Sequence, residues 1–183
     1  MPMGSVSIIP AICHRLSVSR PKHVLDLGIG FGLWGALVRQ YVDNGVTPYA
    51  TRLVGVEGFE GYRNPNWEHY DRVHVCWIGA FLSEAQSTYG AILILDVIEH
   101  FDKDGGHHIL DMAHDRLSPG GELFVATPAI WMEQGAAYGN ELERHRSLWT
   151  ADEFRAMGFD VLMDGSPDAW GNQMILAVKK RGE

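Results

Sequence analysis

The sequence predicts an α/β fold built on one doubly wound, mostly parallel sheet. Short aliphatic and β-branched runs alternate along the chain with segments of helical period, which is the pattern of a parallel sheet with helices on both faces. One run, AILILDV at residues 91–97, is continuously apolar, as in a strand buried on both faces. The 183 residues have the length of one ordinary domain, and no Gly/Ser-rich linker divides them. We therefore expect a single domain over residues 1–183.

The composition argues against some classes of binding partner. A hydrophobic content of 46% is enough to fill one core. The net charge of −8 argues against a general nucleic-acid binder, which carries a basic face, although residues 143–147 form a local basic patch. No apolar run approaches the roughly 20 residues of a membrane span. Cys13 and Cys76 have neither metal-type nor redox-type spacing, so a reduced, cytoplasmic location is expected.

The first half of the chain is expected to open with a helical segment within residues 1–20. Three strand–helix pairs follow it, each strand being a short aliphatic or β-branched run and each helix a less apolar segment. The predicted strands cover residues 23–27, 52–56 and 73–78, and the predicted helices cover residues 33–42, 67–72 and 81–86.

The second half begins with the strand at 91–97 and a helix over 106–117, whose apolar residues recur at helical spacing. The SPGG stretch is predicted to stop that helix before a strand at 122–127. Thr150 and Glu153 have the spacing of a capping box, which starts a helix over 151–157. The last two strands, 159–163 and 173–179, have no helix between them and are expected to form an antiparallel hairpin at one edge.

The glycine-rich stretch VLDLGIGFGLWG, residues 24–35, predicts a nucleotide-binding loop. Gly30-x-Gly32-x-x-Gly35 has the spacing of the dinucleotide fingerprint. In that fingerprint the first glycine comes directly off the strand. Here that residue is Gly28, and in its register the third glycine position falls on Leu33. When the fingerprint is aligned on Gly28, its third glycine is missing, which argues against a dinucleotide as the ligand of this loop.

Two carboxylates near the ends of the first two strands narrow the choice of ligand. Asp26 would lie close to a pyrophosphate and repel it, so it favours a ligand with a cationic head group. Glu57 ends the second strand, where a carboxylate can accept hydrogen bonds from both hydroxyls of a ribose. A solvated strand-end acid is the alternative for Glu57.

Four motifs in order carry a family resemblance: HVLDLGIGFG, LVGVEG, AILILDVIEHF and LSPGGELFVATP. Together, over about residues 20–180, they resemble the class I S-adenosylmethionine-dependent methyltransferases. The resemblance implies a Rossmann-like, seven-stranded sheet with an antiparallel last strand, S-adenosylmethionine as cofactor and S-adenosylhomocysteine as product. It implies that Asp26, Gly28 and Gly30 cradle the methionyl part while Glu57 grips the ribose. The full predicted cofactor set is Asp26, Gly28, Gly30, Phe31, Glu57, Gly58, Gly79, Ala80, Phe81 and Asp96.

The adenine contacts depart from the family pattern. That family often has an Asp or Asn after the third strand, whereas this sequence has Gly79 and Ala80 in WIGAFL. We expect the adenine to be held by backbone groups of residues 78–81, or by apolar packing against Phe59 or Phe81.

The predicted catalytic residues are Asp96, Glu99 and His100, which follow the fourth strand, and His145 in the connection 128–149. A hydroxyl acceptor gains from a general base or from a metal that lowers its pKa. The connection itself is expected to form a substrate loop or lid.

A divalent metal is an open alternative at this site. The set resembles the E-x-x-E-H arrangement, with a later histidine, of metal-assisted quinone-ring and RNA-terminal O-methyltransferases, with Asp96 in place of the first Glu. The other interpretations are a metal-free catalytic role and a purely structural one, in which Glu99 and His100 brace the loop. The predicted site includes no metal ligand.

The sequence thus predicts methyl transfer from S-adenosylmethionine to a small-molecule acceptor, with oxygen preferred as the acceptor atom. Residues 1–20, residues 128–149 and a second subunit are the candidates for the acceptor pocket, so a homodimer is considered. One alternative is a metal-dependent methyltransferase acting on a nucleic-acid terminus. Another is a non-catalytic subunit that binds S-adenosylmethionine or a partner. Neither a membrane nor a nucleic acid is expected as a partner.

Overall fold

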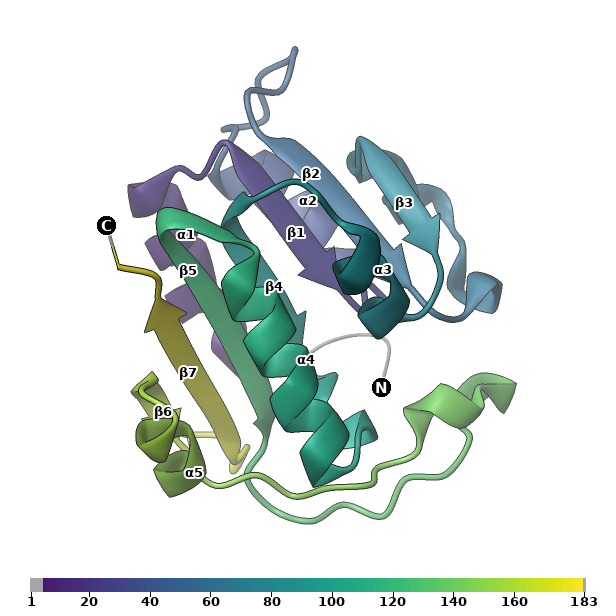
Figure 1. Ribbon diagram of the computed structural model, residues 1–183, viewed down its shortest axis with the longest axis vertical. Helices are drawn as coiled ribbons and strands as arrows, with labels where there is room; N and C mark the ends of the chain where they lie inside the picture. Colours follow the sequence, from purple (N-terminus) through teal and green to yellow (C-terminus); the bar gives the residue numbers. More distant parts are fainter. Residues whose placement is uncertain (1–4, 183) are drawn as a thin grey trace.

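The computed structural model describes residues 5–182 and contains one seven-stranded sheet (Figure 1). The strand order is β3-β2-β1-β4-β5-β7-β6, and β7 runs antiparallel to the other six strands. The predicted fold class is confirmed, including the antiparallel hairpin at one edge. The strands are β1 (His23–Leu27), β2 (Arg52–Glu57), β3 (Arg72–Val75), β4 (Tyr89–Leu95), β5 (Leu117–Pro128), β6 (Asp160–Asp164) and β7 (Met174–Lys180).

Helices cover both faces of the sheet, with α4 in front and α1 and α2 behind in Figure 1. The α-helices are α1 (Ile9–Ser19), α2 (Leu33–Tyr41), α3 (Ile78–Glu84), α4 (Lys103–Asp115) and α5 (Ala151–Ala156). Short 3₁₀ helices lie in the connections: η1 (Val6–Ile8), η2 (Glu60–Tyr62), η3 (Pro65–His69), η4 (Ile98–His100), η5 (Ala137–Gly139) and η6 (Glu141–Glu143). The helical segment expected within residues 1–20 is present from residue 6, and residues 1–4 lie outside the described residues. None of the helices in residues 5–182 is long and apolar enough to cross a bilayer.

The core consists of two apolar layers, one on each face of the sheet. Along β4, Ile92 and Ile94 pack into the layer beneath α3, α4 and α5, whereas Leu93 and Leu95 pack into the layer over α1 and α2. Successive strand residues point to opposite faces, so a strand buried on both sides must be apolar throughout. This confirms the interpretation of the continuous apolar run.

The predicted third strand was wrong at its end. β3 stops at Val75, and Ile78 begins α3 with its side chain buried in the core. The VCWI run is apolar without a period, so its composition does not distinguish a strand from a strand followed by a buried helix start. Trp77 takes the N-cap position of α3 instead of a strand position.

The SPGG stretch was also misassigned. It lies inside β5, which begins at Leu117 and pairs with Tyr89, and α4 has already ended at Asp115. A register shift between Tyr89 and Ala91 accommodates this segment. The start of α4 was placed too late, since Asp102 caps it by accepting a hydrogen bond from the Gly105 N–H. By contrast, the Thr150–Glu153 capping box is confirmed.

Candidate cofactor and active site

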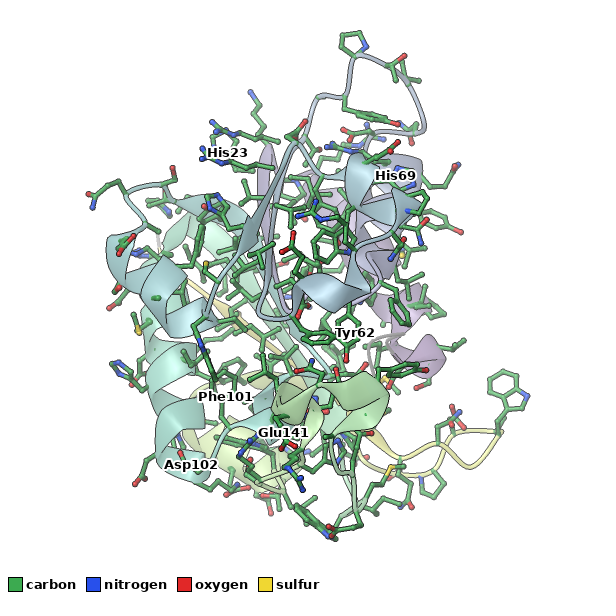
Figure 2. All side chains as sticks on the ribbon, turned by 90° about the vertical axis from the view of Figure 1, so that its right-hand side faces the viewer. His23, Tyr62, His69, Phe101, Asp102 and Glu141 are labelled. Atoms are coloured by element: carbon green, nitrogen blue, oxygen red, sulfur yellow. The ribbon has the colours of Figure 1, made fainter. Side chains whose placement is uncertain are left out.

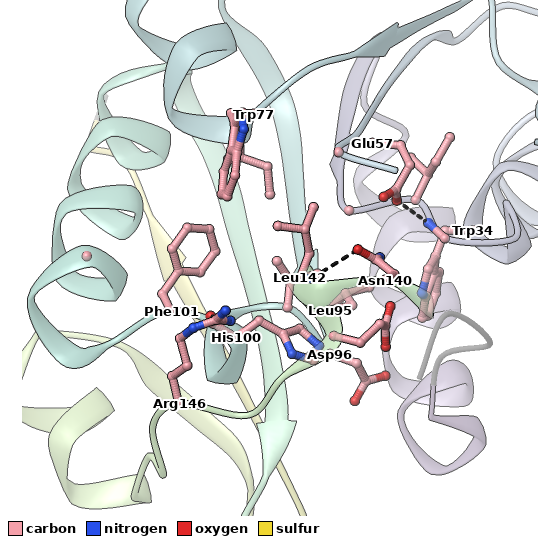
Figure 3. Close-up of a pocket in the computed structure, with 18 of the residues that line it drawn as sticks. Trp34, Glu57, Trp77, Leu95, Asp96, His100, Phe101, Asn140, Leu142 and Arg146 are labelled. Atoms are coloured by element: carbon pink, nitrogen blue, oxygen red, sulfur yellow. Dashed lines mark hydrogen bonds between the residues drawn. The ribbon is translucent and has the colours of Figure 1, made fainter. Parts of the chain in front are cut away.

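A cavity of about 430 Å³ opens at the carboxyl ends of the central strands (Figure 3). In a doubly wound sheet, ligands bind at this edge, where the strand order switches. Each wall of the cavity comes from a different connection. The glycine loop after β1 lies on one side, Glu57 and Gly58 after β2 lie beside it, and the residues after β3, after β4 and in the segment 140–146 complete it.

The glycine loop is held against β2. Gly28 has φ +83°, and a Cβ there would lie 2.5 Å from Val97 Cγ2, so both the backbone conformation and the packing require glycine. The Gly28 N–H donates to the Val56 carbonyl at 2.8 Å, and the Gly30 N–H donates to Glu57 Oε2 at 2.8 Å. These bonds fix the floor on which a ligand would lie.

Glu57 lies in the cavity wall with its carboxylate partly engaged. Besides Gly30, the Phe59 N–H donates to Oε1 at 2.9 Å. Burial raises the pKa of Glu57, and the hydrogen bonds from Phe59 and Gly30 oppose the rise. A carboxylate has about four acceptor sites, so Glu57 retains capacity for two ribose hydroxyls.

Asp26 lies behind the loop, outside the cavity lining. Its carboxylate is 1% exposed and accepts a 2.6 Å hydrogen bond from the Tyr70 hydroxyl, which in turn accepts from the Gly35 N–H at 3.0 Å. Burial raises the pKa of Asp26 to about 7, and the Tyr70 hydrogen bond opposes the rise. The carboxylate therefore connects β1 to the start of α2, and it supports the loop from behind.

On the β3 side the cavity is lined by Trp77 and Ile78, two residues that the sequence analysis did not select. Trp77 is 63% exposed, and Figure 3 shows its indole at the upper part of the site. The predicted Gly79, Ala80 and Phe81 lie further along α3 and do not line the cavity. Their position follows from the end of β3, which lies three residues earlier than predicted.

Two aromatic residues near the glycine loop, Phe31 and Trp34, differ in whether they line the cavity. Phe31 does not line the cavity; its ring packs edge-on against Tyr62 and Tyr138, and its carbonyl accepts from the Asn64 side chain. Trp34 does line the cavity. Its indole N–H is buried and has no hydrogen-bond partner among the described residues.

Asp96 follows β4 with φ +56°, a backbone conformation that is strained for a residue other than glycine. Its carboxylate lines the cavity and accepts two hydrogen bonds from Ser5, one from the backbone N–H at 2.7 Å and one from the hydroxyl at 2.8 Å. Burial raises the pKa of Asp96, and the Ser5 bonds oppose the rise. The N-terminal segment thus reaches the Asp96 carboxylate in the cavity wall.

Glu99, His100 and His145 converge, with one potential ligand atom of each lying within 4.8 Å of the others. Glu99 is buried and accepts a hydrogen bond from the Thr127 hydroxyl at 3.1 Å. Burial, and next the Asp96 charge, raise the pKa of Glu99 to about 8. The structure therefore brings together three of the four predicted catalytic residues, with Asp96 close enough to perturb Glu99.

Hydrogen bonds to the backbone set the tautomers of both histidines. His100 Nδ1 lies 3.2 Å from the Arg144 carbonyl, and His145 Nδ1 lies 2.8 Å from the Met132 carbonyl. Since a carbonyl only accepts, each Nδ1 carries the proton and each Nε2 keeps its lone pair. Burial lowers the pKa of His100 to about 4 and also lowers that of His145, so both rings are neutral near pH 7.

These residues fit a divalent cation. One carboxylate and two neutral imidazoles are ligands that transition metals accept, and an Nδ1–H bond to a backbone carbonyl is the usual support of a metal-binding histidine. The same arrangement also fits a metal-free site in which a neutral imidazole takes a proton.

The segment 129–149 crosses the carboxyl edge of the sheet, as the light green chain in Figure 1 shows. The Tyr62 hydroxyl donates to Glu143 Oε1 at 2.8 Å and accepts from Asn140 Nδ2 at 3.1 Å. Arg146 donates to the carbonyls of His100 and Glu141. The segment 129–149 therefore contacts both Tyr62, in the connection after β2, and His100, in the connection after β4.

The comparisons with known proteins agree with this geometry. The family model described as a methyltransferase domain matches residues 7–162. The chain belongs to this methyltransferase family. It is a class I S-adenosylmethionine-dependent methyltransferase, as its motifs and fold indicated. A comparison with curated proteins found no match.

Solved structures share the fold of this methyltransferase. One is the 1,6-didemethyltoxoflavin-N1-methyltransferase of Burkholderia thailandensis with bound S-adenosylhomocysteine, at 21% identity and a TM-score of 0.65, covering 96% of this chain and 77% of that one. Another is an S-adenosylmethionine-dependent methyltransferase of Archaeoglobus fulgidus, at 13% identity and a TM-score of 0.66, covering 94% of each chain. A third is an O-methyltransferase family protein of Burkholderia thailandensis, at 14% identity and a TM-score of 0.63, covering 97% of this chain and 56% of that one.

Proposed function

We propose that this methyltransferase transfers a methyl group to an oxygen atom of a small-molecule acceptor. The observation that carries the proposal is the convergence of Glu99, His100 and His145 next to the cavity, with both histidines neutral. Methyl transfer to an amine or a thiol depends mostly on alignment, whereas a hydroxyl also needs a base or a metal. The net charge of −8 favours a small acceptor over a nucleic acid.

The residues around the cavity suit the three parts of the cofactor. Glu57 would accept hydrogen bonds from the ribose hydroxyls, and Trp77 with Ile78 would pack against the adenine. The unpartnered Trp34 indole N–H would donate to the methionyl carboxylate. Asp26, Gly28 and Gly30 would shape the loop beneath the methionyl group, with Asp26 acting from behind through Tyr70.

When bound, S-adenosylmethionine supplies an electrophilic methyl group whose bond to sulfur breaks as the bond to the acceptor oxygen forms. His100 lines the cavity and offers Nε2 to the acceptor hydroxyl, whose proton it would take. His145 and the Arg144 carbonyl hold the His100 ring in position, and Glu99 lies buried beside it.

A metal-assisted form of the same reaction is the second candidate, and it is favoured by the ligand spacing of Glu99, His100 and His145. A divalent ion held there would lower the pKa of the acceptor hydroxyl. The direct test is metal binding by calorimetry to the wild type and to His145→Ala. Binding that is lost in His145→Ala while S-adenosylhomocysteine binding is retained supports a metal site; metal binding that the substitution leaves unchanged rules it out.

The experiment that tests the proposal has two stages. First, S-adenosylhomocysteine is titrated into the wild type and Glu57→Ala; we expect micromolar binding that weakens at least tenfold in the variant, since two charge-assisted hydrogen bonds are lost. Second, S-adenosylhomocysteine release is measured over matched phenol, alcohol, amine and thiol acceptors, with and without Mg²⁺. Turnover confined to amines or thiols would contradict the oxygen assignment. Binding without turnover on any acceptor would favour the non-catalytic alternative.

A further inference from the structure

A second pocket lies at the amino ends of β1 to β4, at the opposite edge of the sheet from the cofactor cavity. It measures about 190 Å³, and its lining includes His23, Arg52, Arg72, His74 and Tyr89. Figure 2 labels His23 at the other end of the molecule from Phe101 and Asp102, which line the cofactor cavity. Nothing in the methyl-transfer reaction uses this pocket.

The strand register forces the basic side chains together. His23 pairs with Arg52 between β1 and β2, while Val54 pairs with Arg72 and Val56 pairs with His74 between β2 and β3. Paired residues on neighbouring strands share a face, and residues two apart on one strand share it too. Two guanidinium groups and two imidazoles therefore occupy one face at one corner of the sheet.

No carboxylate of the described residues neutralises this corner. None of the lining residues is acidic, and no acidic side chain in residues 5–182 forms an ion pair with Arg52 or Arg72. This is unusual in a chain with 23 acidic and 15 basic residues. Burial, and next the Arg72 charge, lower the pKa of His74, so the positive charge already present at this corner disfavours a further one. Like charges on adjacent strands are unfavourable, and a bound anion would remove that cost.

We propose that this pocket binds a phosphoryl dianion, as inorganic phosphate or as the phosphate group of a small phosphomonoester. Arg52 and Arg72 on adjacent strands provide two planar donor forks, which suit the tetrahedral oxygens of phosphate. His23, His74 and the neutral side chains of Gln86 and Ser87 add donors around them. The proposal is independent of the methyl acceptor, because the two pockets lie at opposite edges of the sheet.

The test is calorimetric titration of inorganic phosphate and, separately, of ribose 5-phosphate into the full-length protein at constant ionic strength. Arg52→Gln and Arg72→Gln are compared with Arg155→Gln, which removes one charge from an exposed pair with Asp152 on α5. We expect one saturable site with a Kd in the millimolar range or tighter. Arg52→Gln and Arg72→Gln should each weaken phosphate binding at least tenfold, and Arg155→Gln should leave the affinity unchanged. S-adenosylhomocysteine affinity, measured on every variant, verifies that the fold and the other pocket are intact.

Tighter binding of ribose 5-phosphate than of phosphate would support the phosphomonoester form, and equal binding would support the free anion. The proposal is overturned if neither compound binds, or if all three variants weaken binding equally, which would indicate non-specific charge screening. It is also overturned if a short single-stranded RNA binds in an Arg52- and Arg72-dependent way while both small phosphates do not.

Discussion

The position of Asp26 allows a sharp test of how the glycine loop is supported. In the native protein the pKa of this buried carboxyl is about 7, compared with the ordinary value of 3.8. The native state therefore holds its proton more tightly than the unfolded state between these two values. It follows that the contribution of Asp26 to stability falls as the pH rises from about 4 towards 7, and levels off above the folded pKa.

Asp26→Asn removes this titration while keeping the shape and an oxygen that can accept from the Tyr70 hydroxyl. From the two pKa values, the stability of the Asp26→Asn variant relative to the wild type should improve by about 3 kcal/mol between pH 5 and pH 8. Any constant cost of burying the amide cancels in this comparison, because it is the same at both pH values.

The assay is urea unfolding of the wild type and Asp26→Asn at pH 5, 6.5 and 8, with S-adenosylhomocysteine affinity measured on both. Asp160→Asn is the control, since it makes the same substitution at an exposed strand position away from the glycine loop. A stability difference that stays constant from pH 5 to pH 8 would refute the raised pKa. A large loss of S-adenosylhomocysteine affinity in a stable Asp26→Asn protein would show that the carboxylate acts on the cofactor directly.

Three further outcomes are expected. Trp77→Ala should weaken S-adenosylhomocysteine binding by roughly tenfold, because stacking on a base contributes about 1–3 kcal/mol. The free energy of unfolding should change by less than about 0.5 kcal/mol, since the indole is largely exposed. Tyr62→Phe should speed S-adenosylhomocysteine dissociation in stopped-flow by up to about tenfold, since the lid loses its hydroxyl bonds to Glu143 and Asn140; an unchanged rate would contradict a lid at this point. Trp149→Ala should destabilise the fold by about 3–5 kcal/mol in urea unfolding, because the fully buried indole stacks on Phe154.

Much of the cofactor side could be predicted because local sequence determines it. A strand, a positive-φ glycine and a strand-end acid lie within short stretches, and Gly28 and Glu57, which were selected from register alone, line the cavity. The contact between Asp26 and Tyr70 could not be found that way, because 44 residues separate the partners. Only the folded sheet shows that the carboxylate turns away from the cavity.

On the β3 side, the predicted residues differ from the cavity lining for a different reason. Trp77 and Ile78 belong to an apolar run that fits a strand as well as a helix start, and hydrophobicity alone does not choose between them. The choice is made by tertiary packing, since Ile78 is buried in the layer under α3 and α4. One misplaced strand end therefore shifted the predicted contacts to Gly79, Ala80 and Phe81.

The segment 129–149 is hydrogen-bonded to the 3₁₀ helix η4, which carries Glu99 and His100. The N–H groups of Arg146 and Ser147 both donate to the Glu99 carbonyl, at 2.8 and 3.1 Å. Its contacts with Tyr62, in contrast, are made by the side chains of Asn140 and Glu143. Under the proposed function, we expect the segment to loosen first at these side-chain contacts, because the backbone bonds hold Arg146 and Ser147 in place. Cofactor exchange would then proceed beside Glu57 while His145 stays next to His100.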